Sequence, residues 1–133
     1  MPTRYRIRRT QLRDLIKGAV LASQNGGREI CGLIIDTGYS LDLKQVQNKS
    51  KRGGRFAFYV NAVKGFEKAV SLLNYHIVGT FHSHPYYIAE PAGNDLTGSE
   101  DGELMLVIDC LNSQARLWRI QHGSPKSVKY ELL

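Results

Sequence analysis

The chain has 133 residues, 18 lysines and arginines against 12 acidic residues, a formal net charge of +6 and two cysteines. This length predicts one domain over residues 1–133, and an apolar fraction of 42% with 23% charged residues excludes a disordered chain. Two cysteines exclude a disulfide scaffold, no apolar run approaches the ~20 residues of a membrane span, and the basic amino terminus lacks the apolar core of a signal peptide. We therefore expect a soluble cytoplasmic protein that does not associate with membranes.

The first third of the sequence predicts a strand, a helix and a hairpin. Alternation predicts a short edge strand at Tyr5–Arg8, and Thr10 is expected to cap the helix that follows. The glycine-rich residues 25–27 should end this helix. A short apolar run at Ile30–Ile35 predicts a buried central strand, joined by a hairpin to an adjacent strand at Leu41–Val46.

The middle of the chain predicts a loop, a strand and a second helix. The polar, basic residues 48–55 predict a mobile loop, and Phe56–Val60 a short strand. Asn61 should then cap a helix. Its expected buried side consists of Ala62, Val63, Phe66, Ala69, Val70, Leu72 and Leu73.

The last part of the chain predicts mainly strands. A strand at His76–Phe81 leads into two histidines, and a loop then precedes a short helix around Asp95–Ser99. Three further strands are expected, at Glu103–Asp109, Ala115–Gln121 and Ser127–Leu132. Together the elements predict an α/β sandwich of about seven strands and two or three helices.

The charges are segregated along the sequence. Residues 1–17 carry six cations against Asp14 alone, and residues 44–55 carry five cations and no acid. Residues 81–110 carry six acids and no lysine or arginine. The acidic, histidine-containing segment should attract a cation, whereas the basic segments should attract an anionic partner.

Two histidines and an aspartate are the residues that indicate chemistry. His82 and His84 are two apart, so on a strand both imidazoles face the same side. Asp95, at the start of a helix, can bring a carboxylate to the same point. Two imidazoles and a carboxylate form a zinc site with an open fourth position for water. Glu29, just before the buried strand, is the candidate to accept the proton of that water.

This pattern resembles the signature of the JAMM (MPN-domain) metalloproteases. Glu29 precedes the strand, and His82-Ser83-His84-Pro85 comes later in the chain. Six residues separate Pro85 from Ala92, and two residues separate Ala92 from Asp95. The family has serine where this chain has Ala92, usually after a proline, and Pro91 stands in that place. Asn48 also resembles an asparagine often found at the end of the family's second central strand. The resemblance implies a single-domain, cytidine-deaminase-like MPN sandwich, with a curved, mostly antiparallel sheet flanked by helices.

The resemblance also implies roles for individual residues. His82, His84 and Asp95 match the zinc ligands, and Glu29 matches the general acid/base that carries a proton from the zinc-bound water to the leaving amine. The family serine is thought to bind the developing oxyanion, so Ala92 removes one donor. Such a loss typically costs on the order of 100- to 1,000-fold in turnover, unless Ser83, Asn94 or a backbone amide replaces the donor.

The function that the resemblance implies is a Zn²⁺-dependent peptidase or isopeptidase. Its zinc-activated water would attack a Gly-Gly-linked bond of a ubiquitin-like or sulfur-carrier-like β-grasp protein, and the short chain is similar to minimal, stand-alone prokaryotic members. The alternative is a catalytically silent MPN scaffold, with Ala92 as the sign of decay.

Two further questions stay open at the level of sequence. Tyr86 and Tyr87, after the His-Pro turn, could line the substrate groove or could simply pack, and no periodicity decides between these interpretations. The basic segments also allow nucleic-acid binding. We place this interpretation last, because neither a recognition helix nor basic strands with interleaved aromatic residues are evident.

Overall fold

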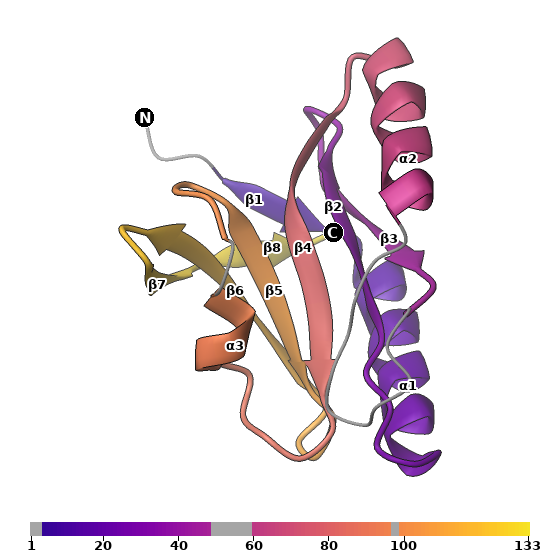
Figure 1. Ribbon diagram of the computed structural model, residues 1–133, viewed down its shortest axis with the longest axis vertical. Helices are drawn as coiled ribbons and strands as arrows, with labels where there is room; N and C mark the ends of the chain where they lie inside the picture. Colours follow the sequence, from indigo (N-terminus) through magenta and orange to yellow (C-terminus); the bar gives the residue numbers. More distant parts are fainter. Residues whose placement is uncertain (1–3, 49–59, 97–98) are drawn as a thin grey trace.

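The computed structural model describes residues 4–48, 60–96 and 99–133. Within these residues it contains eight strands and three helices (Figure 1). In chain order they are β1 (Tyr5–Ile7), α1 (Arg9–Gln24), β2 (Cys31–Asp36), β3 (Leu41–Val46), α2 (Val60–Leu72), β4 (His76–His84), α3 (Gly93–Leu96), β5 (Leu104–Asp109), β6 (Gln114–Gln121), β7 (Ser124–Val128) and β8 (Tyr130–Leu132).

A six-stranded, mostly antiparallel sheet forms the centre of the fold. Its strand order is β3-β2-β4-β5-β6-β7, and only the β4–β5 pair is parallel among these six. A parallel pair needs a crossover connection, and the segment between β4 and β5 contains α3. A second sheet pairs β1 with β8 and so joins the two ends of the described chain. The predicted α/β architecture is confirmed.

The main core lies between α1 and one face of the large sheet. Helix α1 buries Leu12, Leu15 and Ala19 at helical spacing, and these residues pack on sheet residues such as Ile34 and Phe81. Asn25 caps the helix, and Gly26 and Gly27 follow with φ of +77° and +68°. Glycine adopts this left-handed conformation without the steric cost of a Cβ, so the predicted helix end is confirmed.

The opposite face of the sheet carries α2 and α3. Leu43 belongs to the core under α1, so its neighbour Lys44 points to the other face, where its ammonium lies 5.3 Å from the ring centroid of Phe66 on α2. Leu96 of α3 packs against a smaller cluster that consists of Met105, Val107, Trp118 and Ile120. In Figure 1, α1 and α2 lie on the β2–β3 side of the molecule and α3 lies beside β5 and β6.

Two predicted helix starts are wrong. Helix α1 begins at Arg9, and its N-cap is Arg8 without a side-chain hydrogen bond, so Thr10 lies inside the first turn. Helix α2 begins at Val60, so Asn61 also lies inside the helix. The predicted loop at 48–55 and strand at 56–60 fall mostly on residues 49–59, outside the described part, and Val60 itself is helical rather than extended.

The predicted buried face of the second helix is also wrong at several positions. Val70 is buried, but Ala69, Leu72 and Leu73 are exposed, because only one side of α2 contacts the sheet. The expected strand at Ser127–Leu132 is in fact two strands: β7 stays in the large sheet, and β8 leaves it to pair with β1. None of the helices in the described part combines the length and hydropathy of a membrane span.

Candidate metal centre

Strand β4 places its two histidines on one face of the sheet and the serine between them on the other. His82 and His84 are both buried. Ser83 points toward the α1 side, where its Oγ accepts the N–H of Ile30 at 2.8 Å, and its own N–H donates to the Ile30 carbonyl at 3.0 Å. The β4 residues therefore present both imidazoles to one point while Ser83 fixes the start of β2.

Asp95 completes a triangle with the two histidines. The Nε2 atoms of His82 and His84 lie 3.0 Å apart, and each lies 3.0 Å from Oδ2 of Asp95. The backbone N–H of Ala92 donates to the same Oδ2 at 2.7 Å and so orients the carboxylate. A strand end and a four-residue helix eleven positions further on thus bring three ligand atoms together.

The donor set and its spacing fit a divalent metal ion. Nitrogen and oxygen atoms bound tetrahedrally to zinc at its usual bond lengths lie about 3.3 Å from one another. The three equal separations of 3.0 Å are close to this value. Glu29 also belongs to the cluster, because a carboxylate oxygen lies within 4.8 Å of ligand nitrogens of both histidines. The residues that sequence reasoning selected are thus brought together by the fold.

The environment of His84 selects a tautomer suited to metal binding. Its Nδ1 lies 2.8 Å from the carbonyl oxygen of Ile88, which can only accept, so Nδ1 carries the hydrogen and donates it. Nε2, which faces His82 and Asp95, is then the ring nitrogen that a metal ion would bind. The sequence could not reveal this carbonyl contact, because any residue at position 88 provides the same acceptor.

Burial and hydrogen bonding shift the pKa values of the three ligand residues. Burial lowers the pKa of His82 and outweighs the hydrogen bond to Asp95 that raises it. For His84, burial is opposed by the hydrogen bonds to Asp95 and Ile88, which together raise its pKa. Burial also acts to raise the pKa of Asp95, but its hydrogen bonds with the two histidines hold that pKa well below its usual range. Asp95 is therefore ionised over the whole physiological range.

Glu29 lies at the edge of the cluster in a protected position. It is only 4% exposed, and this burial raises its pKa from 4.5 to about 7, although the nearby His84 opposes the shift. The side-chain N–H of Asn48 donates to the backbone carbonyl of Glu29 at 2.8 Å. A buried carboxylate with a pKa near neutrality can both take up and release a proton.

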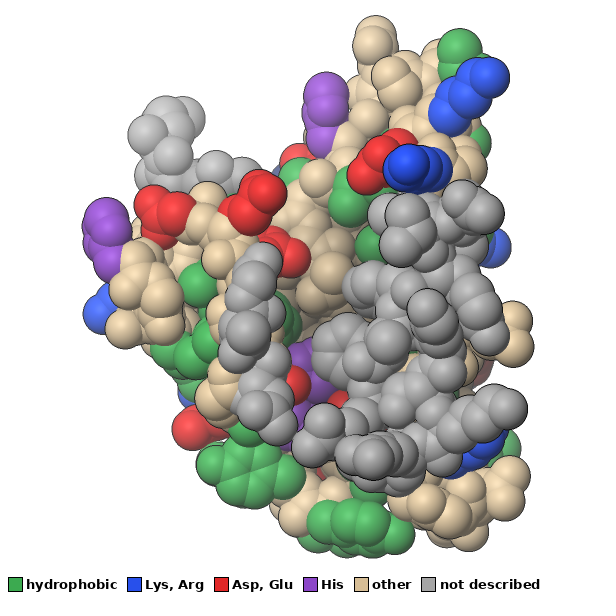
Figure 2. Space-filling model, in the orientation of Figure 1, with side chains coloured by type: hydrophobic (Ala, Val, Ile, Leu, Met, Phe, Trp, Pro, Cys, Tyr) green, Lys and Arg blue, Asp and Glu red, His purple; other side chains and the backbone are tan. Residues whose placement is uncertain are grey.

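The loop after His84 forms one wall of the centre. The ring centroid of Tyr87 lies 5.5 Å from that of His84, while the ring of Tyr86 covers Gly27, where an added Cβ would come within 3.0 Å of it. Trp118 anchors the loop by donating its indole N–H to the Ala89 carbonyl at 2.9 Å. Both tyrosines stay largely exposed. In Figure 2, histidine and acidic side chains meet in a hollow of this face.

The structure narrows the candidates for an oxyanion donor. The Ala92 side chain offers no hydrogen bond, and its backbone N–H is bonded to Asp95. Ser83, which the sequence left as a replacement, points to the opposite face of the sheet. The side chain of Asn94, the other candidate, lies outside the described part of the structure. The structural roles of Ser83 and Trp118 were not identified from the sequence. For Ser83, its position between two histidines that face one side of the strand indicates that its own side chain faces the other side.

Known proteins share this fold. The chain matches a protein of Desulfitobacterium hafniense, solved in solution, with a TM-score of 0.81, 17% identity and coverage of 97% of this chain and 92% of that one. It matches a JAB1/MPN domain protein from Archaeoglobus fulgidus with a TM-score of 0.58, 18% identity and coverage of 99% and 100%. A structure described as a JAMM metalloprotease-like zinc site in the proteasome and signalosome matches with a TM-score of 0.61 and 17% identity. This match covers 98% of this chain and 99% of that one.

The sequence itself identifies the family. None of the curated proteins compared with the chain matches it significantly. The profile of the prokaryotic homologues of the JAB domain, however, matches residues 14–121, which include Glu29, both histidines and Asp95. Because this match covers most of the chain and the fold resembles that of JAB/MPN-domain structures, the chain belongs to the prokaryotic homologues of the JAB domain.

Proposed function

We propose that this protein is a zinc-dependent peptidase or isopeptidase. The observation that carries the proposal is the triangle of His82, His84 and Asp95 ligand atoms at 3.0 Å, with buried Glu29 beside it. Three protein ligands that leave a position open are typical of catalytic zinc, whereas structural zinc is usually enclosed by four. Zinc bound there would supply Lewis acidity toward a water molecule and the scissile carbonyl.

The residues of the chain would divide the remaining work. Asp95 and the two neutral imidazoles hold the metal, and the Ile88 carbonyl keeps His84 oriented through its Nδ1–H. Glu29 takes the proton of the attacking water and gives it to the leaving amine, a double role that a pKa near 7 permits.

The proposed substrate is a ubiquitin-like or sulfur-carrier β-grasp protein with a carboxyl-terminal Gly-Gly. Tyr86 and Tyr87 would line the path of its extended tail, because they are exposed directly beside His84 and Gly27. Glycines suit a narrow approach to the metal, since they place no side chain between the tail and these rings. The Tyr87→Ala variant should raise KM for a tail substrate more than it lowers kcat.

The test uses the purified full chain. Its zinc content should be about one per chain, and it should cleave a fusion in which a ubiquitin-like protein is joined through Gly-Gly to a reporter. Glu29→Gln should abolish cleavage but retain zinc, while Glu67→Gln, an exposed glutamate on α2, should behave as wild type. The proposal would be contradicted if the protein did not bind zinc, or if the Glu29→Gln variant still cleaved the fusion.

One observation favours a second candidate, a catalytically silent scaffold. Ala92 supplies no side-chain donor, and Ser83 does not replace it. If the missing donor limits turnover, Ala92→Ser should accelerate cleavage by about 10- to 1,000-fold, whereas Ala69→Ser, an exposed alanine on α2, should change nothing. A wild-type chain that binds zinc, cleaves no Gly-Gly fusion and stays inactive as Ala92→Ser would support the scaffold.

A further inference from the structure

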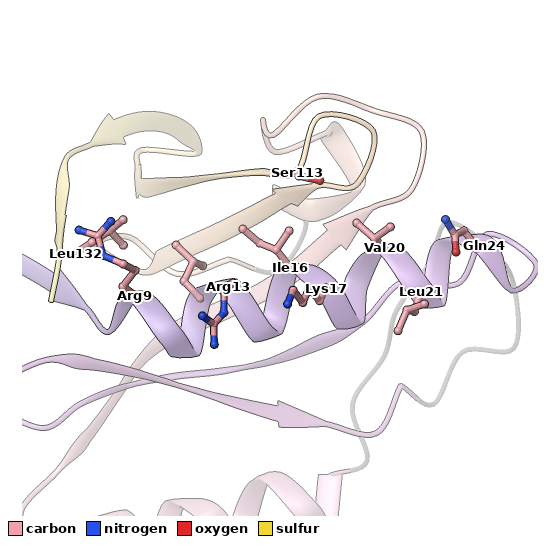
Figure 3. A pocket seen from close by; sticks show the side chains of 10 residues that line it. Arg9, Arg13, Ile16, Lys17, Val20, Leu21, Gln24, Ser113 and Leu132 are labelled. Carbon is pink, nitrogen blue, oxygen red and sulfur yellow. The ribbon is translucent and has the colours of Figure 1, made fainter.

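A long groove runs along α1, on the side of the large sheet opposite the metal centre. Its volume is about 720 Å³, and one wall is α1 from Arg9 to Gln24. Leu132 of β8 and Ser113 of the β5–β6 turn form the other wall. Figure 3 shows Ile16 and Val20 standing on the side of α1 that faces Ser113, with Leu132 close to Arg9. The groove is open along a helix and is not a closed cavity.

The floor of this α1 groove is apolar. Leu12, Ile16 and Val20 follow one another at intervals of four residues and therefore form one row along the helix. Leu21 and Leu132 flank the row and are 67% and 41% exposed. Leu12 is buried, so the apolar surface open to solvent comes from Leu21, Leu132 and the half-buried Ile16 and Val20. Apolar side chains grouped in this way at the surface are a common mark of a binding site.

One edge of the α1 groove is cationic. Arg9, Arg13 and Lys17 form a second row with the same spacing, and none of the described residues that line the groove is acidic. At the amino-terminal end of α1, the backbone N–H of Arg9 is bonded to the Leu133 main-chain oxygen at 2.9 Å, so the cationic edge consists of the three side chains. Arg13 has one exposed contact with Asp14 at 3.3 Å, and within the described residues neither Arg9 nor Lys17 is paired with a carboxylate. The row is thus available to external anions.

We propose that the α1 groove binds an amphipathic helix of a partner protein, with an apolar stripe flanked by aspartates and glutamates. The partner's apolar residues would cover Ile16, Val20 and Leu21, while its carboxylates, one turn apart, would face the cationic row. A second copy of the chain fits poorly, because a two-fold contact through this face brings the cationic row near its own copy.

An anionic bilayer is also a poorer occupant than a helix. The apolar residues lie along a groove with two walls, which a rod enters but a flat membrane surface does not. Three cations also fall short of the four to eight that typically attach a protein segment to acidic lipids.

The first experiment measures binding of defined peptides to the wild-type chain by fluorescence anisotropy. The probe is a fluorescein-labelled 18-residue helix with a leucine stripe flanked by glutamates. Two matched peptides replace its glutamates by lysines or its leucines by serines. The acidic amphipathic peptide should bind at least about tenfold more tightly than either control, and its affinity should fall as the salt concentration rises. Equal affinity for the acidic and lysine peptides would overturn the proposal, as would no binding.

The second experiment locates the binding site on the chain. Lys17→Glu and Leu21→Glu should each lower the affinity for the acidic peptide by about fivefold or more. The matched variants Lys126→Glu and Leu72→Glu, both at exposed positions elsewhere, should bind like wild type. Since all four positions are exposed, circular dichroism should show four folded proteins. Loss of binding in Leu72→Glu but not in Leu21→Glu would place the peptide elsewhere and reject the groove.

The alternative occupants are tested in parallel. Vesicles of phosphatidylcholine and phosphatidylglycerol should not retain the chain at physiological salt, and retention that Lys17→Glu abolishes would overturn the helix proposal in favour of a membrane. Sedimentation should show a monomer. A dimer that the Leu21→Glu variant dissociates would mean that a second copy covers the groove.

Discussion

Ser83 connects the segment that carries Glu29 to the strand that carries the two histidines. Its hydroxyl and backbone N–H both bond to Ile30, the residue directly after Glu29, while its neighbours in the strand are the two histidines. The same residue thus fixes the distance between the candidate proton acceptor and the candidate metal ligands. Ser83 is a positioning residue, because it touches neither the metal site nor a substrate path.

Replacement of Ser83 by alanine should therefore affect stability and geometry together. The variant leaves the buried N–H of Ile30 without its acceptor, which should cost about 1–3 kcal/mol in the free energy of unfolding. Urea denaturation measures this, with Ser127→Ala on exposed β7 as the control. If Ser83 also positions Glu29, kcat should fall in Ser83→Ala at unchanged zinc content. An unchanged kcat would limit the residue to a structural role.

The raised pKa of Glu29 predicts a pH-dependent stability for metal-free protein. The folded chain holds the Glu29 proton up to about pH 7, whereas the unfolded chain releases it near 4.5. The folded state therefore binds more protons between these values, and burial of Glu29 destabilises the fold increasingly as the pH rises from 4.5 to 7. Glu29→Gln removes this loss, so its stability relative to wild type should grow by about 1–3 kcal/mol over that range.

The measurement is denaturant unfolding of both chelator-treated proteins at several pH values. Glu67→Gln on α2 is the control, because its side chain is exposed. A constant difference between Glu29→Gln and wild type from pH 4.5 to 7.5 would contradict the raised pKa.

At the level of elements, β2 depends on a close contact that only glycine allows. Gly32 pairs with Phe81 across the β2–β4 ladder, and the Phe81 ring covers it. A Cβ at this position would lie 2.2 Å from the Lys44 carbonyl oxygen and 2.3 Å from the ring. The tight packing of β2 between β3 and β4 holds the start of β2 in place, and Glu29 lies just before this start.

The Gly32→Ala variant should therefore be strongly destabilised. The backbone carbonyl of Lys44 cannot move without disturbing the β2–β3 ladder, so we expect a loss of about 3 kcal/mol or more in urea unfolding. Gly65→Ala is the matched control, because a Cβ there meets nothing and an alanine stabilises a helix interior by about 0.5–1 kcal/mol. Similar stabilities for the two variants would show that β2 can yield locally.

At the level of the whole molecule, metal binding should stabilise the fold across distant segments. The three candidate ligand atoms come from β4 and α3, which are joined by a loop that is itself bonded to β6 through Trp118. A ligand that binds only the folded state stabilises it by about 2.7 kcal/mol at one hundred times its dissociation constant. Zinc at that concentration should therefore raise Tm by roughly 8–15 °C.

Calorimetry with zinc and with a chelator tests this expectation. His82→Ala and Asp95→Asn should lose the zinc-dependent rise in Tm, while His122→Asn should keep it. His122 is an exposed turn residue with a φ of +52°, which asparagine tolerates well. A rise in Tm that persists in His82→Ala would show that zinc stabilises the chain elsewhere.

Several features of this protein follow from sequence alone, because they depend on local spacing. Alternation along a strand is enough to place His82 and His84 on one side, and Asn-Gly-Gly is enough to end α1. The strand at Leu41–Val46 has the bounds that its alternation predicts. The spacing from the histidines to Asp95 resembles the signature of a known family, and the family profile matches residues 14–121.

The tertiary structure decided what depends on contacts between distant segments. The sequence shows that α2 has an apolar side, but only the packing of α2 on the sheet leaves Leu72 and Leu73 exposed. The separation of β8 from β7 depends on its pairing with β1 at the other end of the described chain. The raised pKa of Glu29 and the shared Oδ2 of Asp95 likewise arise from burial and convergence in space, which local periodicity does not encode.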